Sequence, residues 1–145
     1  MFEGQQNQRG SAAMTDFATK RLPQAPDVVA PDGSDVRVLA RTERGGMAHF
    51  ELAPGRASEA IRHRTVDEIW FVLSGRGEIW RKQGDREEIV ALEPGVSLTI
   101  PVGTHFQFRT HGDEALTAVG VTMPPWPGDT EAVPVPGKWK ASEFS

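Results

Sequence analysis

The sequence contains no cysteine among its 145 residues. This absence excludes disulfides, thiolate metal ligands and thiol nucleophiles, so any metal must be bound by histidine, carboxylate or water. The sequence also lacks an apolar run of 18 or more residues, which argues against a membrane-spanning helix. Its net charge is −4, and lysine and arginine form no basic cluster. We therefore predict that neither a nucleic acid nor a membrane is a partner.

The two ends of the chain differ in composition from its middle. Residues 1–33 mix Gln, Asn, Pro and Gly without the basic-then-apolar order of a signal peptide, which predicts a flexible arm and a cytoplasmic protein. Residues 124–145 are rich in proline, which cannot donate a hydrogen bond inside a sheet. We expect them to form an arm that packs on the domain through Trp126 and Trp139. The folded domain is predicted to span residues 34–123.

Between these arms the sequence consists of short apolar or alternating segments separated mostly by Gly, Pro or Asp. Such segments at intervals of about 8–12 residues are typical of an all-β sandwich or barrel. The predicted strands are 36–40, 47–53, 68–73, 77–82, 87–92, 96–101, 105–110 and 116–122.

One stretch combines glycines with an imidazole and a carboxylate at regular spacing. Gly55 is followed after five residues by Ile61-Arg-His63, Glu68 comes after four more residues, and Gly75 after a further six. Glycine has the lowest cost where a turn needs a positive φ angle, so Gly75 is expected in a turn between strands.

A second stretch has the pattern Gly95, five residues, Pro101-Val-Gly103. Together the two stretches resemble the two motifs of the cupin superfamily, and the resemblance extends over about residues 36–122. It implies an antiparallel jelly-roll β-barrel that binds a small-molecule ligand or substrate and forms a homodimer. It is compatible with metabolic enzymes of the isomerase, epimerase, dioxygenase or lyase type.

The sequence departs from the family at three positions. Ile61 occupies the place of the first metal-binding histidine of the family, and an isoleucine cannot bind metal. His105 lies one residue too early for the second-motif histidine, and a strict count puts Phe106 there. The asparagine of the family is replaced by Thr110 or Arg109, depending on that count.

The orientation of this last strand decides the character of the pocket, because a shift of one residue turns every side chain to the other face. If His105 points inward, Gln107 and Arg109 follow it and the pocket is polar. If Phe106 points inward, Phe108 joins it and the pocket is apolar. We expect His105 to face inward, because a shortened turn can restore the register.

Two versions of the chemistry follow. In the first, His63, Glu68 and His105 form a set of two histidines and one carboxylate, which suits a divalent transition metal such as Fe, Mn, Ni or Zn. In the second, no metal is bound, and Glu68 and His63 act as general base and acid on a carbonyl or sugar substrate. A non-catalytic module that binds a sugar or a pathway intermediate is the third interpretation.

Four further residues are candidates for substrate binding. His49 and Trp70 are expected to line the pocket, and Gln107 and Arg109 to bind a substrate carboxylate. The alternatives are a surface histidine, a core tryptophan and a salt bridge at the rim of the barrel.

Two surface features complete the prediction. The outward positions Ile69, Phe71 and Leu73 either supply the dimer contact or pack inside the sandwich. The charged segment RKQGDREE, 81–88, is interpreted as a solvated hairpin without chemistry.

Overall fold

The computed structural model describes residues 16–143 and consists of β-strands and connecting segments, with no helix in that range. Residues 1–15, which belong to the predicted N-terminal arm, and residues 144–145 lie outside the described part. The strands are β1 (Val28–Val29), β2 (Asp35–Arg41), β3 (Gly46–Leu52), β4 (Ile61–His63), β5 (Asp67–Ser74), β6 (Arg76–Gln83), β7 (Arg86–Leu92), β8 (Ser97–Ile100), β9 (His105–His111), β10 (Leu116–Met123) and β11 (Ala132–Pro134).

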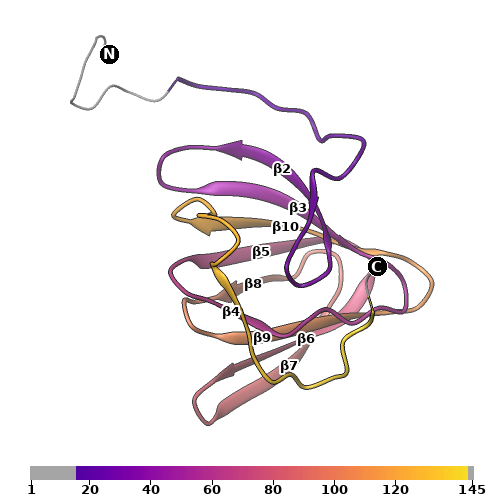
Figure 1. Ribbon diagram of the computed structural model, residues 1–145. Helices are drawn as coiled ribbons and strands as arrows, with labels where there is room; N and C mark the ends of the chain where they lie inside the picture. Colours follow the sequence, from indigo (N-terminus) through magenta and orange to yellow (C-terminus); the bar gives the residue numbers. More distant parts are fainter. Residues whose placement is uncertain (1–15, 144–145) are drawn as a thin grey trace.

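The strands form two antiparallel sheets (Figure 1). One sheet has six strands in the order β1-β2-β3-β10-β5-β8, and the other has five in the order β11-β4-β9-β6-β7. All eight strands expected from the sequence are present, and the all-β prediction is confirmed. The three that sequence reasoning missed, β1, β4 and β11, have only two or three residues each and so carry no periodic signal.

The core lies between the two sheets, and strand alternation decides which residues enter it. In β5, Trp70 and Val72 are buried, whereas Ile69, Phe71 and Leu73 are 44–46% exposed on the outer face. The alternative in which these three residues pack inside the sandwich is therefore wrong. The core cluster consists of Leu52, Ile61, Trp70, Val72, Ile79, Leu92, Leu98, Ile100, Phe106, Phe108, Leu116 and Ala118.

One turn between sheets depends on a glycine. Gly75, between β5 and β6, has φ of +83°, which side chains other than glycine rarely adopt. A Cβ atom there would also collide with the carbonyl oxygen of Ala115 and lie 2.7 Å from the Cα atom of Leu116. The predicted positive φ at this position is confirmed, and a substitution would displace the backbone.

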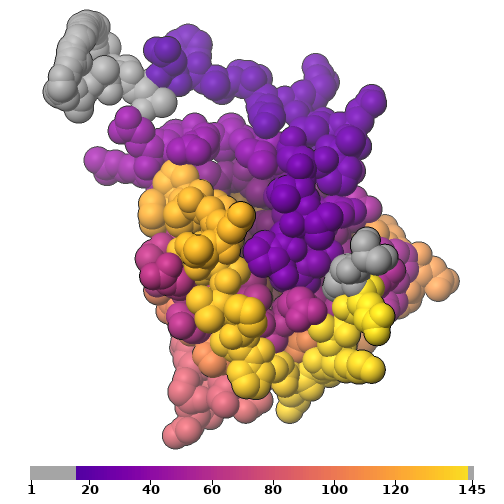
Figure 2. All heavy atoms as spheres, viewed as in Figure 1, coloured from indigo at the N-terminus to yellow at the C-terminus, as the bar shows by residue number. Residues whose placement is uncertain are grey.

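Segments near both ends of the described chain pack against the same face of the molecule (Figures 1 and 2). The loop after β1, in indigo, folds back to β2, and Ala30 N donates a 2.8 Å hydrogen bond to the Ser34 carbonyl. The proline-rich segment, in orange and yellow, adds β11 to the edge of the five-stranded sheet beside β4. An edge strand tolerates Pro134, because only one side of it is paired.

Candidate functional site

An imidazole and a carboxyl group lie together between the sheets. His63 ends β4 in one sheet and Glu68 is the second residue of β5 in the other, so the short connection between them crosses from sheet to sheet. His63 Nε2 and Glu68 Oε1 are 3.7 Å apart, and the residues are only 2% and 4% exposed. That distance is too long for a hydrogen bond. The two residues that were predicted to act together are therefore adjacent and enclosed.

The connection between them is held by Glu131, a buried carboxylate from the proline-rich segment. Its two carboxylate oxygens accept hydrogen bonds from Thr65 N (2.6 Å), Thr65 Oγ1 (2.7 Å) and Val66 N (2.9 Å). Burial alone would raise the pKa of Glu131, but these hydrogen bonds lower it overall. An ionised Glu131 thus fixes the turn that positions both His63 and Glu68.

Burial changes the protonation of Glu68. Desolvation raises the pKa of its carboxyl group to about 8, and the negative charge of Asp32 raises it further. The nearby Trp70 indole offsets part of this rise, although its N–H makes no hydrogen bond within the described residues. Glu68 is consequently protonated, and a proton donor, at neutral pH.

His63 is shifted in the opposite direction. Burial lowers the pKa of its imidazole to about 4, and the charge of Glu131 only partly opposes this effect. The imidazole is therefore neutral at pH 7, and its Nδ1 atom has no hydrogen-bond partner within residues 16–143. The pair combines a neutral base with a protonated acid.

Aromatic rings surround His63. The ring of Phe106 approaches it edge-on at 5.2 Å and that of Trp126 at 5.1 Å, measured between centroids. Phe106 belongs to the core, whereas Trp126 comes from the proline-rich segment and is 38% exposed. Trp126 therefore lies at the border between His63 and solvent.

The expectation that His105 faces the interior is wrong. Phe106 and Phe108 both belong to the core, so alternation along β9 turns His105 to the outer face beside its β6 neighbour Lys82. Partial burial and the charges of Lys82 and Arg62 lower the pKa of His105. The shortened turn before β9 does not restore the register, because two phenylalanines gain more from burial than one imidazole.

The predicted three-ligand metal set is consequently not assembled. Within the described part of the chain, no group of three His, Asp or Glu side chains is placed to hold a metal ion. Ile61 and Phe106, at the family's other ligand positions, are both buried and offer no donor atom. The pair offers one imidazole and one carboxyl group, which is fewer protein ligands than a resident transition metal usually takes.

Trp70 is the one predicted substrate-binding residue that lies near the pair. It is buried, stacks on Phe50 at 5.6 Å and meets the ring of Phe108 edge-on at 5.0 Å. It is therefore a core residue that also forms the wall behind Glu68. His49 lies on the opposite face of β3 from Phe50, close to the charges of Arg37 and Glu51.

Gln107 and Arg109 lie on the outer face of β9 with His105. The Gln107 side chain donates to the Ser58 and Trp139 carbonyls and accepts from the Lys138 and Trp139 amides, so it holds the C-terminal segment. The Arg109 guanidinium pairs with Glu78 at 2.7 Å and lies 4.2 Å above the Trp139 ring. The structure does not bring either side chain to the His63–Glu68 pair.

Sequence reasoning missed two further residues at the pair. Gly120 leaves the space that Glu68 occupies, because a Cβ atom there would lie 2.7 Å from Glu68 Oε2 and 2.6 Å from the Phe50 ring. A lone glycine inside the predicted strand 116–122 was the available signal. Asp32 is buried, accepts hydrogen bonds from Ser34 N and Oγ, and has a pKa raised by desolvation. It lies in a segment that had been taken as a flexible arm.

Two antiparallel sheets that enclose a buried imidazole and carboxyl group define an all-β jelly-roll protein with a polar site in its interior. The chain belongs to the cupin domain family, whose sequence pattern it matches over residues 48–122. The resemblance drawn from the two motifs is thereby confirmed. No curated protein sequence matches the chain. None of the described residues forms a helix long and apolar enough to cross a membrane.

Solved structures extend the comparison. A Klebsiella pneumoniae protein with a double-stranded β-helix domain is 19% identical, with a TM-score of 0.59 over 72% of this chain and 85% of that one. KdgF from Halomonas sp. is 19% identical, with a TM-score of 0.57 over 66% and 82%. An oxalate decarboxylase is 17% identical, with a TM-score of 0.63 over 77% of this chain and 30% of its own. At these identities the likeness establishes the fold alone.

Proposed function

We propose that the protein is a metabolic enzyme that transfers protons on a small carbonyl or sugar substrate bound between the sheets, without a resident metal. The observation that supports this proposal is the His63–Glu68 pair, 3.7 Å apart, with one pKa lowered to about 4 and the other raised to about 8. Groups whose pKa values are shifted apart by burial are typical of acid–base catalysis. This favours isomerase, epimerase or lyase chemistry over the dioxygenase type, which needs a redox-active metal and therefore more ligand groups than this pair offers.

The protonation states assign opposite roles to the two residues. The neutral imidazole of His63 accepts a proton from the carbon next to the carbonyl group, and the Glu68 carboxyl donates its proton to the carbonyl oxygen. The C–H electron pair forms the double bond of an enol. Return of a proton to the other face of the same carbon, while the enol O–H proton goes back to the Glu68 carboxylate, gives an epimer. Return of a proton to the former carbonyl carbon, while a hydroxyl group on the neighbouring carbon gives its proton to Glu68, gives an isomer. The roles are the reverse of those expected from the sequence, in which Glu68 was the base.

Access to the pair requires a movement, because both residues are almost fully buried. Trp126 is the partly exposed side chain in contact with His63, and it belongs to a segment without regular pairing before β11. We infer that displacement of Trp126 admits the substrate. The same ring excludes water when it returns, which strengthens the electrostatic effects inside.

Exchange of substrate hydrogen with solvent deuterium tests the proposed function. A panel of hydroxycarbonyl compounds and sugars is incubated with the protein in D₂O and followed by proton NMR. Exchange should be lost in Glu68→Gln and His63→Gln and retained in His111→Gln, whose side chain is 50% exposed. Exchange that survives in both pair variants would overturn the proposal.

Metal analysis and binding assays separate the alternatives. Activity that follows stoichiometric metal content, and disappears with a chelator, would replace proton transfer by metal chemistry. Saturable binding of a metabolite without any exchange would instead identify a non-catalytic binding module. Activity in chelator-treated protein with no bound metal supports the proposal.

We also propose that two copies associate through the outer face of the six-stranded sheet, as the family resemblance implies. Met47, Ile69, Phe71 and Leu73 expose 39–46% of their surface there, and they lie close together in the register of β3, β10 and β5. Contiguous exposed apolar side chains are typical of an interaction surface. A second copy would cover this surface with the same residues.

A further inference from the structure

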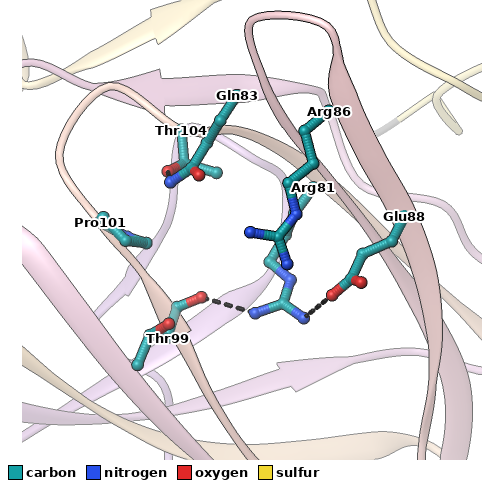
Figure 3. Close-up of a pocket in the computed structure, with 7 residues that line it drawn as sticks. All are labelled: Arg81, Gln83, Arg86, Glu88, Thr99, Pro101 and Thr104. Atoms are coloured by element: carbon teal, nitrogen blue, oxygen red, sulfur yellow. Dashed lines mark hydrogen bonds and ion pairs between the residues drawn. The ribbon is translucent and has the colours of Figure 1, made fainter.

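A hollow of about 270 Å³ lies at the end of the β6–β7 hairpin (Figure 3). Gln83 and Arg86 are register partners, as are Arg81 and Glu88, so all four side chains project from the same face of the hairpin. The opposite wall comes from β8 and the loop after it. The residues around the hollow are Arg81, Gln83, Arg86, Glu88, Thr99, Pro101 and Thr104.

Two hydrogen bonds fix the Arg81 side chain in the lining of the hollow. Its Nη1 atom donates to the Thr99 carbonyl at 2.8 Å, and its Nη2 atom donates to Glu88 Oε1 at 3.0 Å. Its Nε atom is buried and has no partner within residues 16–143. Glu88 therefore compensates the charge of Arg81 and orients its guanidinium group.

Arg86 reaches into the same hollow from β7, and its guanidinium group points toward that of Arg81 (Figure 3). Among the described residues, no ion pair or hydrogen bond joins the Arg86 side chain to another residue of the lining. The lining thus holds two cationic side chains and one carboxylate. One positive charge has no counter-charge there, and two neighbouring guanidinium groups repel each other.

A third donor completes the hollow. Gln83 Nε2 donates to Thr104 Oγ1 at 3.0 Å, which occupies a lone pair of the hydroxyl group and leaves its proton free to donate. Guanidinium and hydroxyl groups that converge on one space are the donors that bind carboxylate and phosphate oxygens.

We propose that this hollow binds the oxyanion, a carboxylate or a phosphate group, of a small organic molecule, with Arg86 as the main charge partner. Arg81, already oriented by Glu88, adds a fixed positive potential, and Thr104 donates a neutral hydrogen bond. The hollow is distinct from the His63–Glu68 pair, because neither His63 nor Glu68 is among the residues that line it. The proposal does not depend on the proposed function.

The test titrates the full chain with inorganic phosphate, acetate and malonate at constant ionic strength, followed by NMR chemical shifts and calorimetry. Saturable binding is expected for at least one probe, and Arg86→Gln should weaken it by about tenfold, the effect of one charged hydrogen bond. Glu88→Gln should tighten it, since a competing carboxylate is removed. Arg76→Gln is the matched control, because Arg76 begins β6 and pairs with Glu93 at 3.1 Å.

The outcomes discriminate among sources of the oxyanion. Binding of phosphate alone identifies a phosphate ester, and binding of acetate or malonate alone identifies an organic acid. No saturable binding, or equal effects of Arg86→Gln and Arg76→Gln, would overturn the proposal. Glu68→Gln should leave the affinity of the hollow for phosphate or carboxylate unchanged. The anion-binding test and the hydrogen-exchange test can therefore fail independently of each other.

Discussion

His63 Nε2 and Glu68 Oε1 lie 3.7 Å apart although the two residues belong to different sheets. Only the three residues 64–66 separate the end of β4 from the start of β5, and Glu131 holds all three by hydrogen bonds, Arg64 through its carbonyl oxygen and the other two through its carboxylate. The short connection between the sheets therefore also brings the imidazole of His63 and the carboxyl group of Glu68 together. Their opposite pKa shifts follow from the same burial.

The raised pKa of Glu68 predicts that stability falls at alkaline pH. The folded protein keeps this proton up to about pH 8, whereas the unfolded chain loses it near 4.5, so the free energy of unfolding decreases as pH rises between them. From pH 6.5 to 8 the loss due to Glu68 should reach about 1.5 kcal/mol. Urea denaturation at both pH values measures it.

Glu68→Gln should remove this decline, because the variant has no proton to lose at this position. Glu93→Gln is the control, since the Glu93 side chain is 53% exposed. An unchanged slope in Glu68→Gln would show that the carboxyl group does not hold a proton in the folded protein.

The lowered pKa of His63 predicts an opposing effect at acid pH. The unfolded chain binds a proton near pH 6.5 and the folded protein only near 4, so His63 makes stability rise with pH between these values. The two slopes should nearly cancel from pH 4.5 to 6.5. In His63→Gln the opposing effect is absent, so the free energy of unfolding should fall with pH over the whole range from 4.5 to 8. A variant whose stability depends on pH as in the wild-type protein would contradict the lowered pKa of His63.

Glu131→Ala should destabilise the protein by about 3 kcal/mol, because the amide groups of Thr65 and Val66 would lose a buried acceptor. Thermal and urea unfolding measure the loss. Asp129→Ala, at an exposed position two residues earlier, should change stability little. Equal stability of the two variants would mean that the turn holds without the Glu131 carboxylate.

Gly120→Ala should destabilise the protein by about 1–3 kcal/mol, as expected for overpacking, and abolish the proposed proton exchange. The added methyl group would press on the Glu68 carboxyl and the Phe50 ring. Gly46→Ala is a matched control, because a Cβ atom there would meet its neighbours at an ordinary 3.7 Å. Wild-type stability and exchange in Gly120→Ala would show that the space beside Glu68 is not limiting.

Phe71→Glu should convert the proposed dimer into a monomer, because a charge would be introduced into the apolar outer face of β5. Light scattering after size-exclusion chromatography measures the mass of each species. Ile89→Glu is the control, since Ile89 is 42% exposed on β7 in the other sheet. A monomeric wild-type protein, or a Phe71→Glu variant that still associates, would contradict the proposed interface.

The sequence by itself determined the all-β architecture and much of the site. Alternation and turn residues are local signals, so the longer strands and the positive φ of Gly75 were predictable from neighbours along the chain. The adjacency of His63 and Glu68 was implied by the resemblance to the first cupin motif. Strands as short as β4 could not be predicted, because three residues are too few to show an alternating pattern.

Only the tertiary structure decided which face of β9 enters the core. The residue pattern allowed either His105 or Phe106 to point inward, and the choice depended on packing against Ile61, Trp70 and other distant residues. The position of Glu131 was also decided only by the tertiary structure, because its carboxylate accepts a hydrogen bond from the amide of Val66, 65 residues away in the sequence. The anion-binding geometry proposed for Arg81 and Arg86 likewise depends on the fold, which places both side chains around one hollow. Contacts between residues far apart in sequence leave no local pattern, so they appear only when the chain is folded.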